Sequence, residues 1–289
     1  MKIEFTKMHG LGNDFVLIDI NKNPELSEMS EDHLTTLSIF ICKRRFGVGA
    51  DQMLLLLPSD QADFRMRIFN ADGSEVEMCG NGIRCLGSYI WEHGLSDKTV
   101  LDIETLAGII RPERRNGQVR VDMGVPAFNP YDIPLDTTVL DERYSEEVID
   151  YPLEIEGEVF NISCVSMGNP HAVIVVDEVK TFPVSYFGPM IENHPLFPNR
   201  TNVEFIEVIN ENEIRMRVWE RGAGETMACG TGATASAVIA AKKGLTKRDV
   251  KVHLLGGDLY IEWINEGSAY MTGPATTVFD GVLEYTPER

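Results

Sequence analysis

The sequence has few cysteines for its length and lacks a long apolar run. Its 289 residues include five cysteines, too few for a disulfide-stapled scaffold. No run of about 18 apolar residues is present, and the opening MKIEFTKMHG lacks the apolar core of a signal peptide. We therefore expect no membrane-spanning helix, a cytoplasmic location, and cysteines that stay reduced.

Positive charge is scarce as well. The chain has 26 Lys and Arg against 45 Asp and Glu, a net charge of −19. Such a field repels nucleic acid and anionic membrane, so neither is an expected partner. Low-complexity tracts are absent, and 43% hydrophobic residues are typical of a folded chain, here long enough for two domains. A small molecule remains the expected partner, because the local field of a pocket can oppose the global one.

Two segments repeat one pattern at an offset of 150 residues (65 against 215). RMRIFNADGSEVEMCGNG (residues 65–82) aligns without a gap with RMRVWERGAGETMACGTG (residues 215–232). The alignment places Cys79 opposite Cys229, and each is followed by Gly-x-Gly.

A second match supports the first. LGNDFVLID (residues 11–19) resembles MGNPHAVIV (residues 167–175), and a further position matches at the offset of 150. The opposed pairs are Asn13 with Asn169, Phe15 with His171, and Gln52 with Asn202. Three matched blocks in one order predict a duplicated domain with pseudo-twofold symmetry.

Each half contains a strand, a turn and a helix in that order. Residues 65–73 alternate in polarity and then turn, as a strand does. Residues 81–94 and 232–244 have helical character and end at a glycine. The second helix is apolar or small nearly all round, which predicts burial on most sides. Short apolar strands flank it in the sequence, so each half is expected to be α+β, with a curved sheet around one helix.

The halves are expected to comprise residues 1–126 with 277–289, and residues 127–276. Residues 126–147 are turn-rich and charged, which predicts a connection between the halves. The last strand, TVFDGVLEY, is expected to return to the first half. Residues 188–202 are Pro-rich and are predicted to form a loop that either closes over a substrate or stays static on the surface.

Cysteine at a helix start suggests a chemistry. The first turn of a helix has unpaired N–H groups and a partial positive charge, which lower a thiol pKa and bind anions. If Cys79 and Cys229 face each other across a cleft, a carboxylate fits between the helix starts and the sulfurs flank the adjacent carbon. One thiolate would remove that carbon's proton and one thiol would return a proton to the opposite face, without a cofactor. Close thiols would share one proton and titrate in two separated steps.

Other roles for the cysteines remain open. Cys42, Cys85 and Cys164 are expected to be packing residues, as most lone cysteines are. A zinc site at Cys79 and Cys85 is a weaker alternative, because the spacing is unusual and no histidine pair is near. A disulfide-exchange pair of Cys79 and Cys229 is another alternative, although the sequence has no Cys-x-x-Cys. Because the two sulfurs are expected to lie close together, we also expect a Cys79–Cys229 disulfide to inactivate the protein.

Four motifs together resemble the diaminopimelate epimerase family: MCGNGIRC, ERGAGETMACGTG, HGLGNDFVLID and SMGNPH. The resemblance extends over essentially the whole chain. Proline and hydroxyproline racemases share the two-cysteine plan, but ERGAGET before Cys229 is more similar to the diaminopimelate enzymes.

The resemblance implies a fold and an activity. The family has two similar domains, each a barrel-like and mostly antiparallel sheet around a central helix, with the active site in the cleft between them. It interconverts LL- and meso-2,6-diaminopimelate for lysine and peptidoglycan synthesis, uses neither pyridoxal phosphate nor metal, and usually forms homodimers. We therefore expect no cofactor here.

The resemblance also assigns roles to particular residues. Catalysis is expected of Cys79 and Cys229, assisted by His171 and Glu220. The loops for the reacting carboxylate are Gly80, Asn81, Gly230 and Thr231, and the reacting amino group is expected to meet Asn70, Glu220 and Arg221. The distal end of the substrate is expected to meet Asn13, Gln52, Asn169, Asn202 and Arg221. Amides suit a zwitterion and arginine suits a carboxylate.

Plain structural roles compete with these assignments. Asn13 and Asn169 could be turn residues, His171 a satisfied core histidine, and Glu220 with Arg221 a surface pair. Two rival functions also stay open: another two-thiol racemase with a different amino acid substrate, and a non-catalytic amino-acid-binding protein.

Overall fold

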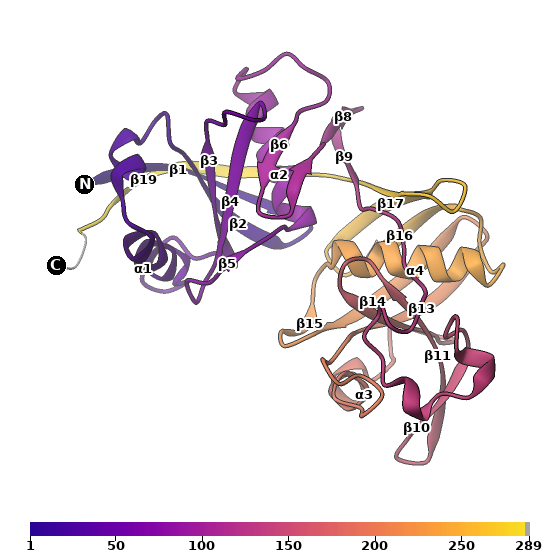
Figure 1. The fold of residues 1–289 in the computed structure, drawn as a ribbon. Coiled ribbons are helices and arrows are strands. Elements are labelled where there is room, and N and C mark those ends of the chain that lie inside the picture. The colour runs from indigo at the N-terminus through magenta and orange to yellow at the C-terminus, as the bar shows by residue number, and fades with distance from the viewer. Residues whose placement is uncertain (287–289) are drawn as a thin grey trace. The chain divides into compact units, whose positions relative to one another are not determined.

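The structure, a computed structural model that describes residues 1–286, divides into two compact units (Figure 1). The first comprises Met1–Val121 and the chain from Thr272 onward, and the second comprises Asp122–Met271. The expected boundaries lie a few residues further along the chain, and the assignment of residues 1–126 with 277–289 and 127–276 to functional halves stays a prediction. So does the cleft between the halves.

The first unit is built on one mixed, mostly antiparallel sheet. Its strands run in the order β19-β1-β2-β3-β4-β6-β7, with β5 paired to β4. Neighbours are antiparallel except β2 with β3 and β4 with β6, which are parallel. The strands are β1 (Lys2–Gly10), β2 (Asn13–Asp19), β3 (Gln52–Leu57), β4 (Phe64–Asn70), β5 (Glu75–Val76), β6 (Ile103–Thr105), β7 (Gly108–Ile110) and β19 (Thr276–Glu284). A hairpin of β8 (Glu113–Arg115) and β9 (Gln118–Asp122) follows.

Helices cover both faces of this sheet. α2 (Gly80–Glu92) packs on β1 to β4, and α1 (Glu31–Cys42) packs on β3 and β4. A 3-10 turn (Pro24–Glu28) precedes α1. The strand β3 is apolar on both faces because a helix lies on each, so side chains pointing either way are buried. The expected return of the last strand is confirmed, since β19 pairs along β1.

The second unit repeats this plan. Its sheet runs in the order β10-β11-β12-β13-β14-β16-β17-β18, with β15 paired to β14. The strands are β10 (Tyr151–Ile155), β11 (Glu158–Ser166), β12 (Pro170–Val175), β13 (Asn202–Asn210), β14 (Glu213–Glu220), β15 (Gly224–Thr226), β16 (Asp249–Leu254), β17 (Gly257–Trp263) and β18 (Ala269–Gly273). The helices are α3 (Val184–Glu192) and α4 (Gly230–Lys242), with 3-10 turns at Thr137–Val139 and Glu142–Tyr144.

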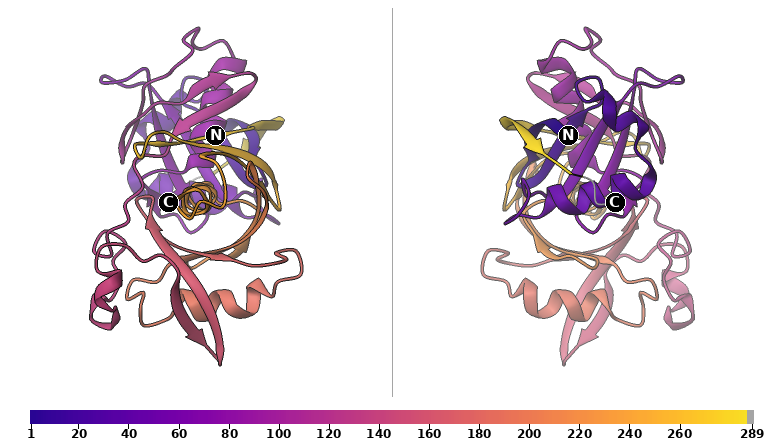
Figure 2. Two further views of the ribbon diagram at one scale, coloured as in Figure 1. Left: turned by 90° about the vertical axis from the view of Figure 1, so that its right-hand side faces the viewer. Right: turned by 90° about the vertical axis from the view of Figure 1, so that its left-hand side faces the viewer.

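The duplication extends to the direction of every matched pairing. β2 is parallel to β3 and β12 to β13, whereas β3 with β4 and β13 with β14 are antiparallel. One helix precedes the central strand of each sheet, and the other follows the short strand β5 or β15. The α+β class and the two matched units, each a sheet around a helix, are therefore confirmed; Figure 2 shows α4 end-on, with strands curving around it.

The central helices form for local reasons. In α2 the buried residues Ile83, Leu86 and Ile90 share one face, and Gly94 ends the helix with a positive φ of 64°. In α4 nearly every residue before the last turn is buried, and Gly244 takes the same role with a φ of 70°. Small side chains let the surrounding strands approach α4 closely.

Two predicted segments differ from the structure. Residues 126–147 do not connect the halves, because Ile133, Leu135 and Tyr144 belong to the core of the second unit. Their charged neighbours face solvent, so the average composition of the segment predicts an exposed connection although a few of its residues are buried. Residues 188–202 are not a loop throughout, since they begin inside α3 and contain the buried Leu196 and Phe197.

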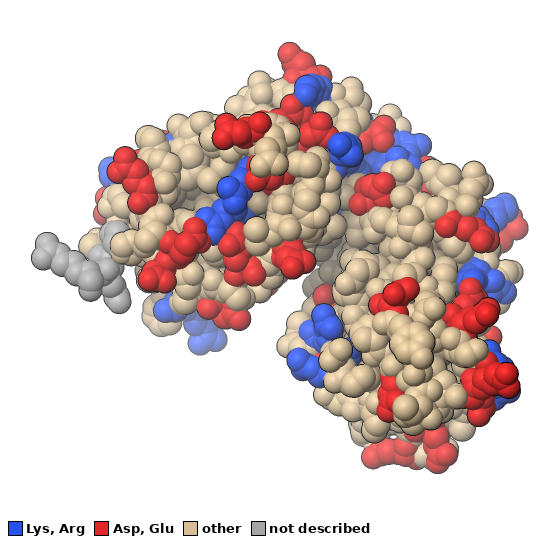
Figure 3. Space-filling view, in the orientation of Figure 1, with Lys and Arg blue, Asp and Glu red and all other residues tan. Residues whose placement is uncertain are grey.

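Acidic side chains are spread over both units in the view of Figure 3, as the net charge of −19 implies. No helix among residues 1–286 is long and apolar enough to cross a lipid bilayer.

The buried anchor at Phe197 gives a stability prediction. We expect Phe197→Ala to lower the free energy of unfolding by about 3–5 kcal/mol, because a core aromatic leaves a cavity. Urea denaturation of the purified chain measures this. The exposed Asn199, two residues on, is the matched control, and Asn199→Ala should change stability little. Equal stability of the two variants would mean that the segment is not anchored.

Candidate active site: two cysteine-capped helix starts

Each central helix begins directly after a cysteine. Cys79 and Cys229 are the N-cap residues of α2 and α4, with extended backbones of φ −139° and −120°. Each sulfur accepts the backbone N–H of the glycine three residues on, Gly82 or Gly232, at 3.4 Å. A sulfur in this position meets the positive end of the helix dipole, which favours a thiolate.

In the first unit, Asn13 holds the side chains around Cys79. Its Oδ1 accepts from the Cys79 thiol at 3.8 Å and from Asn81 Nδ2 at 3.2 Å. Its Nδ2 donates to Asp51 at 3.0 Å. Asn13 is thus the first residue of β2 and also a link to the helix start at Gly80 and Asn81.

Two side-chain amides of the first unit, Gln52 and Asn81, each have an oxygen atom without a hydrogen-bond donor. Gln52 on β3 and Asn70 on β4 are paired residues of the sheet, and Gln52 Nε2 donates to Asn70 Oδ1 at 2.9 Å. Gln52 Oε1 and Asn81 Oδ1 are buried without a hydrogen-bond donor. A buried acceptor without a donor is costly, so both atoms are suited to a ligand N–H.

A buried cation accompanies Cys79. Arg84 is fully buried in α2 and donates to the carbonyls of Gly80 and Pro274, each at 3.3 Å. Burial lowers the pKa of its guanidinium, whereas the thiols of Cys85 and Cys79 raise it. The sequence reasoning missed Arg84, although a charged residue among the apolar positions of a predicted buried helix was a signal.

In the second unit, a chain of polar contacts leads from a buried carboxylate to Cys229. Glu204 Oε1 lies 2.7 Å from His171 Nδ1, and His171 Nε2 lies 2.9 Å from Asn169 Oδ1. Asn169 Nδ2 donates to Thr231 Oγ1 at 3.3 Å, and Thr231 Oγ1 lies 3.5 Å from Cys229 Sγ. The structure therefore brings three predicted residues, Asn169, His171 and Thr231, together beside Cys229.

Glu220 adds a second carboxylate to this half. Burial raises the pKa of Glu220, and hydrogen bonds from Thr226 and Cys229 lower it by less. Burial also raises the pKa of the Cys229 thiol well above its usual value, the carboxylates of Glu220 and Glu204 raise it further, and Thr231 and Gly232 lower it. The expectation that the helix start lowers the thiol pKa is therefore wrong for Cys229, because desolvation and two anions outweigh the helix end.

Asn202 is the first residue of β13, and Arg221 follows the last residue of the neighbouring strand β14. Asn202 Nδ2 donates to the carbonyl of Pro170 at 2.9 Å, and its Oδ1 accepts the Arg221 backbone N–H at 3.0 Å. Asn202 thus ties together the ends of β12 and β14. The Arg221 side chain is exposed and reaches the carbonyl of Asn199 at 3.4 Å, so its guanidinium keeps donors available.

The remaining cysteines fit their predicted packing role. Cys42, Cys85 and Cys164 are buried, and burial raises the pKa of the Cys42 and Cys85 thiols to about 12. Within residues 1–286 no group of three His, Cys, Asp or Glu side chains is placed to hold a metal ion, so the zinc alternative has no cluster to support it.

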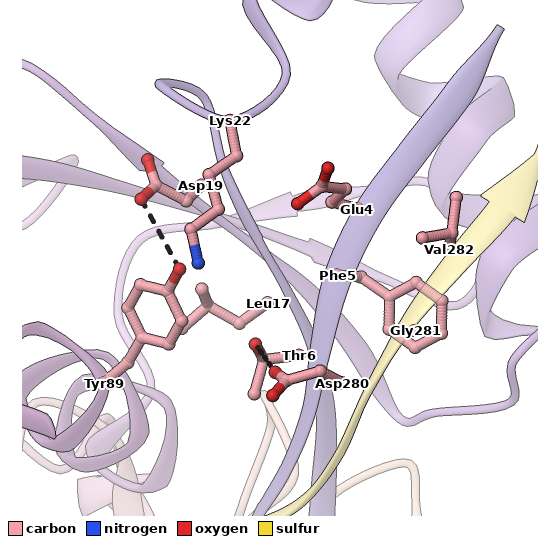
Figure 4. Close-up of a pocket in the computed structure, with 10 residues that line it drawn as sticks. All are labelled: Glu4, Phe5, Thr6, Leu17, Asp19, Lys22, Tyr89, Asp280, Gly281 and Val282. Carbon is pink, nitrogen blue, oxygen red and sulfur yellow. Dashed lines mark hydrogen bonds between the residues drawn. The ribbon is translucent and has the colours of Figure 1, made fainter. Parts of the chain in front are cut away.

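A cavity of about 340 Å³ in the first unit contains none of the predicted site residues (Figure 4). Two of its three acidic side chains have hydrogen-bond donors: Asp19 accepts from the Tyr89 hydroxyl at 3.4 Å, and Asp280 accepts from Thr6 at 2.6 Å. Lys22 lies over the Tyr89 ring, 5.3 Å from its centre. We therefore place the candidate active site at the cysteine-capped helix starts and not in this cavity.

Comparison with known proteins decides the family. The family model for diaminopimelate epimerase matches residues 5–129 and 163–278. The diaminopimelate epimerase of Moorella thermoacetica is 54% identical over 285 residues, which cover 96% of this chain and 98% of the relative. This chain belongs to the diaminopimelate epimerase family.

Solved structures of lower identity share the fold of this diaminopimelate epimerase family member. A phenazine biosynthesis protein of the PhzF family from Bacillus anthracis matches with a TM-score of 0.70 and 19% identity, covering 99% of this chain and 100% of its own. A hydroxyproline epimerase from Agrobacterium vitis, solved with trans-4-hydroxy-L-proline, matches at 0.66 and 14%, covering 98% and 92%. At these identities the likeness concerns the fold.

Every predicted site residue lies within the two segments matched by the diaminopimelate epimerase model. The sequence reasoning did not find Glu204. Its signal was a glutamate among the apolar residues at the start of the strand NVEFIEVI, opposite Leu54 at the offset of 150 residues (54 against 204).

The glycine beside each sulfur has a different neighbour, which gives a second prediction. A Cβ at Gly232 would lie 2.7 Å from Glu204 Oε1, whereas one at Gly82 would lie 3.3 Å from Leu54 Cδ2. We expect Gly232→Ala to destabilise the chain by about 1–3 kcal/mol, because the buried Glu204 is held by His171 and cannot yield cheaply. Urea denaturation measures it.

Gly82→Ala is the matched control at the same helical position, and it should cost clearly less. Equal losses of stability in the two variants would contradict the close approach of Glu204 to α4.

Proposed function

We propose that this chain interconverts LL-2,6-diaminopimelate and meso-2,6-diaminopimelate, in lysine and peptidoglycan biosynthesis. The observation that carries the proposal is the pair of cysteine-capped helix starts, in a chain that matches diaminopimelate epimerases over nearly its whole length. The reaction is an isomerisation at one α-carbon and needs no redox partner.

The chemistry needs one thiolate and one thiol. A carbon beside a carboxylate is a very weak acid, and loss of its proton places negative charge on the carboxylate oxygens. The backbone N–H groups of Gly80 and Asn81 and of Gly230 and Thr231 belong to the first turns of their helices, where N–H groups lack intrahelical acceptors, and would stabilise that charge. One thiolate takes the α-proton and becomes a thiol, and the other thiol gives its proton to the opposite face and becomes a thiolate. The stereocentre inverts and the number of protons on the protein is unchanged.

Assisting roles follow from the contacts of the second unit. Glu220 is hydrogen-bonded to the Cys229 thiol, and His171 is joined to it through Asn169 and Thr231. We assign both residues to the control of the Cys229 proton.

Recognition of the substrate is assigned to amides and to Arg221. The acceptor oxygens of Gln52 and Asn81, buried without a donor, suit an ammonium group. Arg221 has guanidinium donors available for a carboxylate. Asn13, Asn70, Asn169 and Asn202 complete the proposed set. A substrate with amino acid groups at both ends explains this number of amides better than proline does.

Location and assembly belong to the same proposal. We propose a cytoplasmic homodimer that binds its small-molecule substrate and neither nucleic acid nor membrane. The acidic net charge and the membership of a biosynthetic family support this assignment.

The two-thiol scheme makes a direct prediction. We expect Cys79→Ala and Cys229→Ala each to reduce interconversion by at least about 10³-fold, because each removes one acid–base group from a step that needs both. A chirality-resolved assay on LL-diaminopimelate, without added cofactor, measures it. Cys42→Ala, at a buried thiol outside the site, is the control and should stay active.

Isotope exchange tests the proton route. In deuterium oxide, product formed by the native chain should carry solvent deuterium at the inverted carbon. Full activity of either cysteine variant, or product without solvent deuterium, would contradict the two-base scheme. Equal turnover of proline would instead support a racemase of different specificity.

A further inference from the structure

The first turns of α2 and α4, which follow Cys79 and Cys229, pack against different side chains. In the first unit a Cβ at Gly82 would meet Leu54 Cδ2 at 3.3 Å and Phe15 Cε1 at 3.5 Å. In the second unit a Cβ at Gly232 would meet Glu204 Oε1 at 2.7 Å and Cys229 Sγ at 3.3 Å. An apolar pair in one half is therefore replaced by an ionisable pair in the other, His171 with Glu204.

Glu204 is a buried carboxylate with one oxygen atom that accepts no hydrogen bond. It lies on β13, with its side chain fully buried on the face that α4 covers. Its Oε1 contacts His171, and its Oε2 is buried without a hydrogen-bond partner. Both ring nitrogens of His171 face oxygen atoms, so Glu204 and Asn169 together fix the orientation of the ring. A carboxylate is costly in such a place, and its retention requires a reason beyond packing.

The position of Glu204 opposes the effect of the helix start. The first turn of α4 presents positive charge to Cys229, which favours a thiolate. Glu204 packs against the same turn at Gly232, where the low dielectric strengthens its repulsion of a second anion.

The strands that pack against α4 carry other titratable side chains. Glu220 from β14 is a further carboxylate, and His171 from β12 pairs with Glu204. The charge of Glu204 also raises the pKa of the Cys164 thiol on β11, whose side chain packs in the core on the opposite face of the sheet. On β16 and β17, His253 and Asp258 pair with each other at 2.7 Å.

We propose that Glu204 is a positioning residue that keeps Cys229 as the protonated thiol of the resting protein and holds His171 in place beside it. The inference rests on the proposed function for what the thiols do, and on the described contacts for Glu204 itself. The resting Cys229 then supplies the S–H proton that the opposite face of the substrate receives. Cys79 has a different setting, with Leu54 beneath its turn and the cation of Arg84 in its helix.

The test is the pH dependence of alkylation of each thiol by iodoacetamide. A thiolate displaces iodide and forms an S–C bond, so the midpoint of the rate against pH reports the ionisation of that thiol. Mass spectrometry of the Cys79 and Cys229 peptides follows both sites in one sample. In the native chain we expect Cys79 to become reactive at lower pH than Cys229.

Glu204→Gln should change Cys229 alone. We expect its midpoint to fall by about 0.5 to 1 pH unit, a rate about three- to tenfold higher at pH 7.5, because one like charge is removed. The Cys79 midpoint should stay unchanged. Comparison of midpoints, rather than of maximal rates, separates ionisation from a change in access. If E204Q folds poorly, E204M, of similar length and without a polar head, takes its place with the same expectation.

Glu211→Gln is the matched control, since it removes the same charge from an exposed side chain in the turn that follows β13 and should leave both midpoints in place. An unchanged or raised Cys229 midpoint in the Glu204 variant would overturn the inference, even if stability fell. The readout needs no turnover, so a chain that lacks epimerase activity could still show the shift, and failure of the proposed function is thereby distinguished from failure of this inference.

Discussion

One hydrogen bond in each unit organises its helix start: the backbone N–H of a glycine donates to the sulfur of the cysteine that caps its helix. Sulfur occupies the place that a serine or aspartate oxygen usually takes at an N-cap. The arrangement requires a strand that delivers the cysteine in an extended conformation and a helix that starts at once. Because the third helical residue is glycine, the cysteine sulfur and the side chain from the sheet, Leu54 or Glu204, can both lie close to the helix backbone. In each unit the curved sheet therefore holds one such turn in place.

The two units share one backbone plan, but the side chains around Cys79 and Cys229 differ. Arg84 in α2 and Thr234 in α4 stand at matched positions, and each donates to the carbonyl at the start of its own helix. The first is a buried cation and the second a neutral hydroxyl. Leu54 and Phe15 beneath one turn correspond to Glu204 beneath the other and to its partner His171. Substitutions at a few buried positions thus give one thiol a cationic and apolar setting and the other an acidic one, which a reaction with one base and one acid can use.

Local patterns predicted the elements well where one face or all faces of an element are apolar. The helix ends at Gly94 and Gly244 and the return of the last strand follow from spacing and turn chemistry alone. Residues 126–147 and 188–202 were assigned wrongly, because a few buried side chains among many polar ones decide where a segment packs. Ile133, Tyr144 and Phe197 are such residues. Composition averages over them, whereas packing depends on each one.

The sequence by itself determined the duplication, the two capped cysteines and the family, because these depend on residues adjacent in the chain and repeated at one offset. Only the tertiary structure decided how each thiol is surrounded. Glu204, Glu220 and His171 come from three strands, and their distances to Cys229 depend on how the sheet curves around α4. An electrostatic field at one atom sums over neighbours in space, so the acidic setting of Cys229 could not be obtained from its neighbours in sequence.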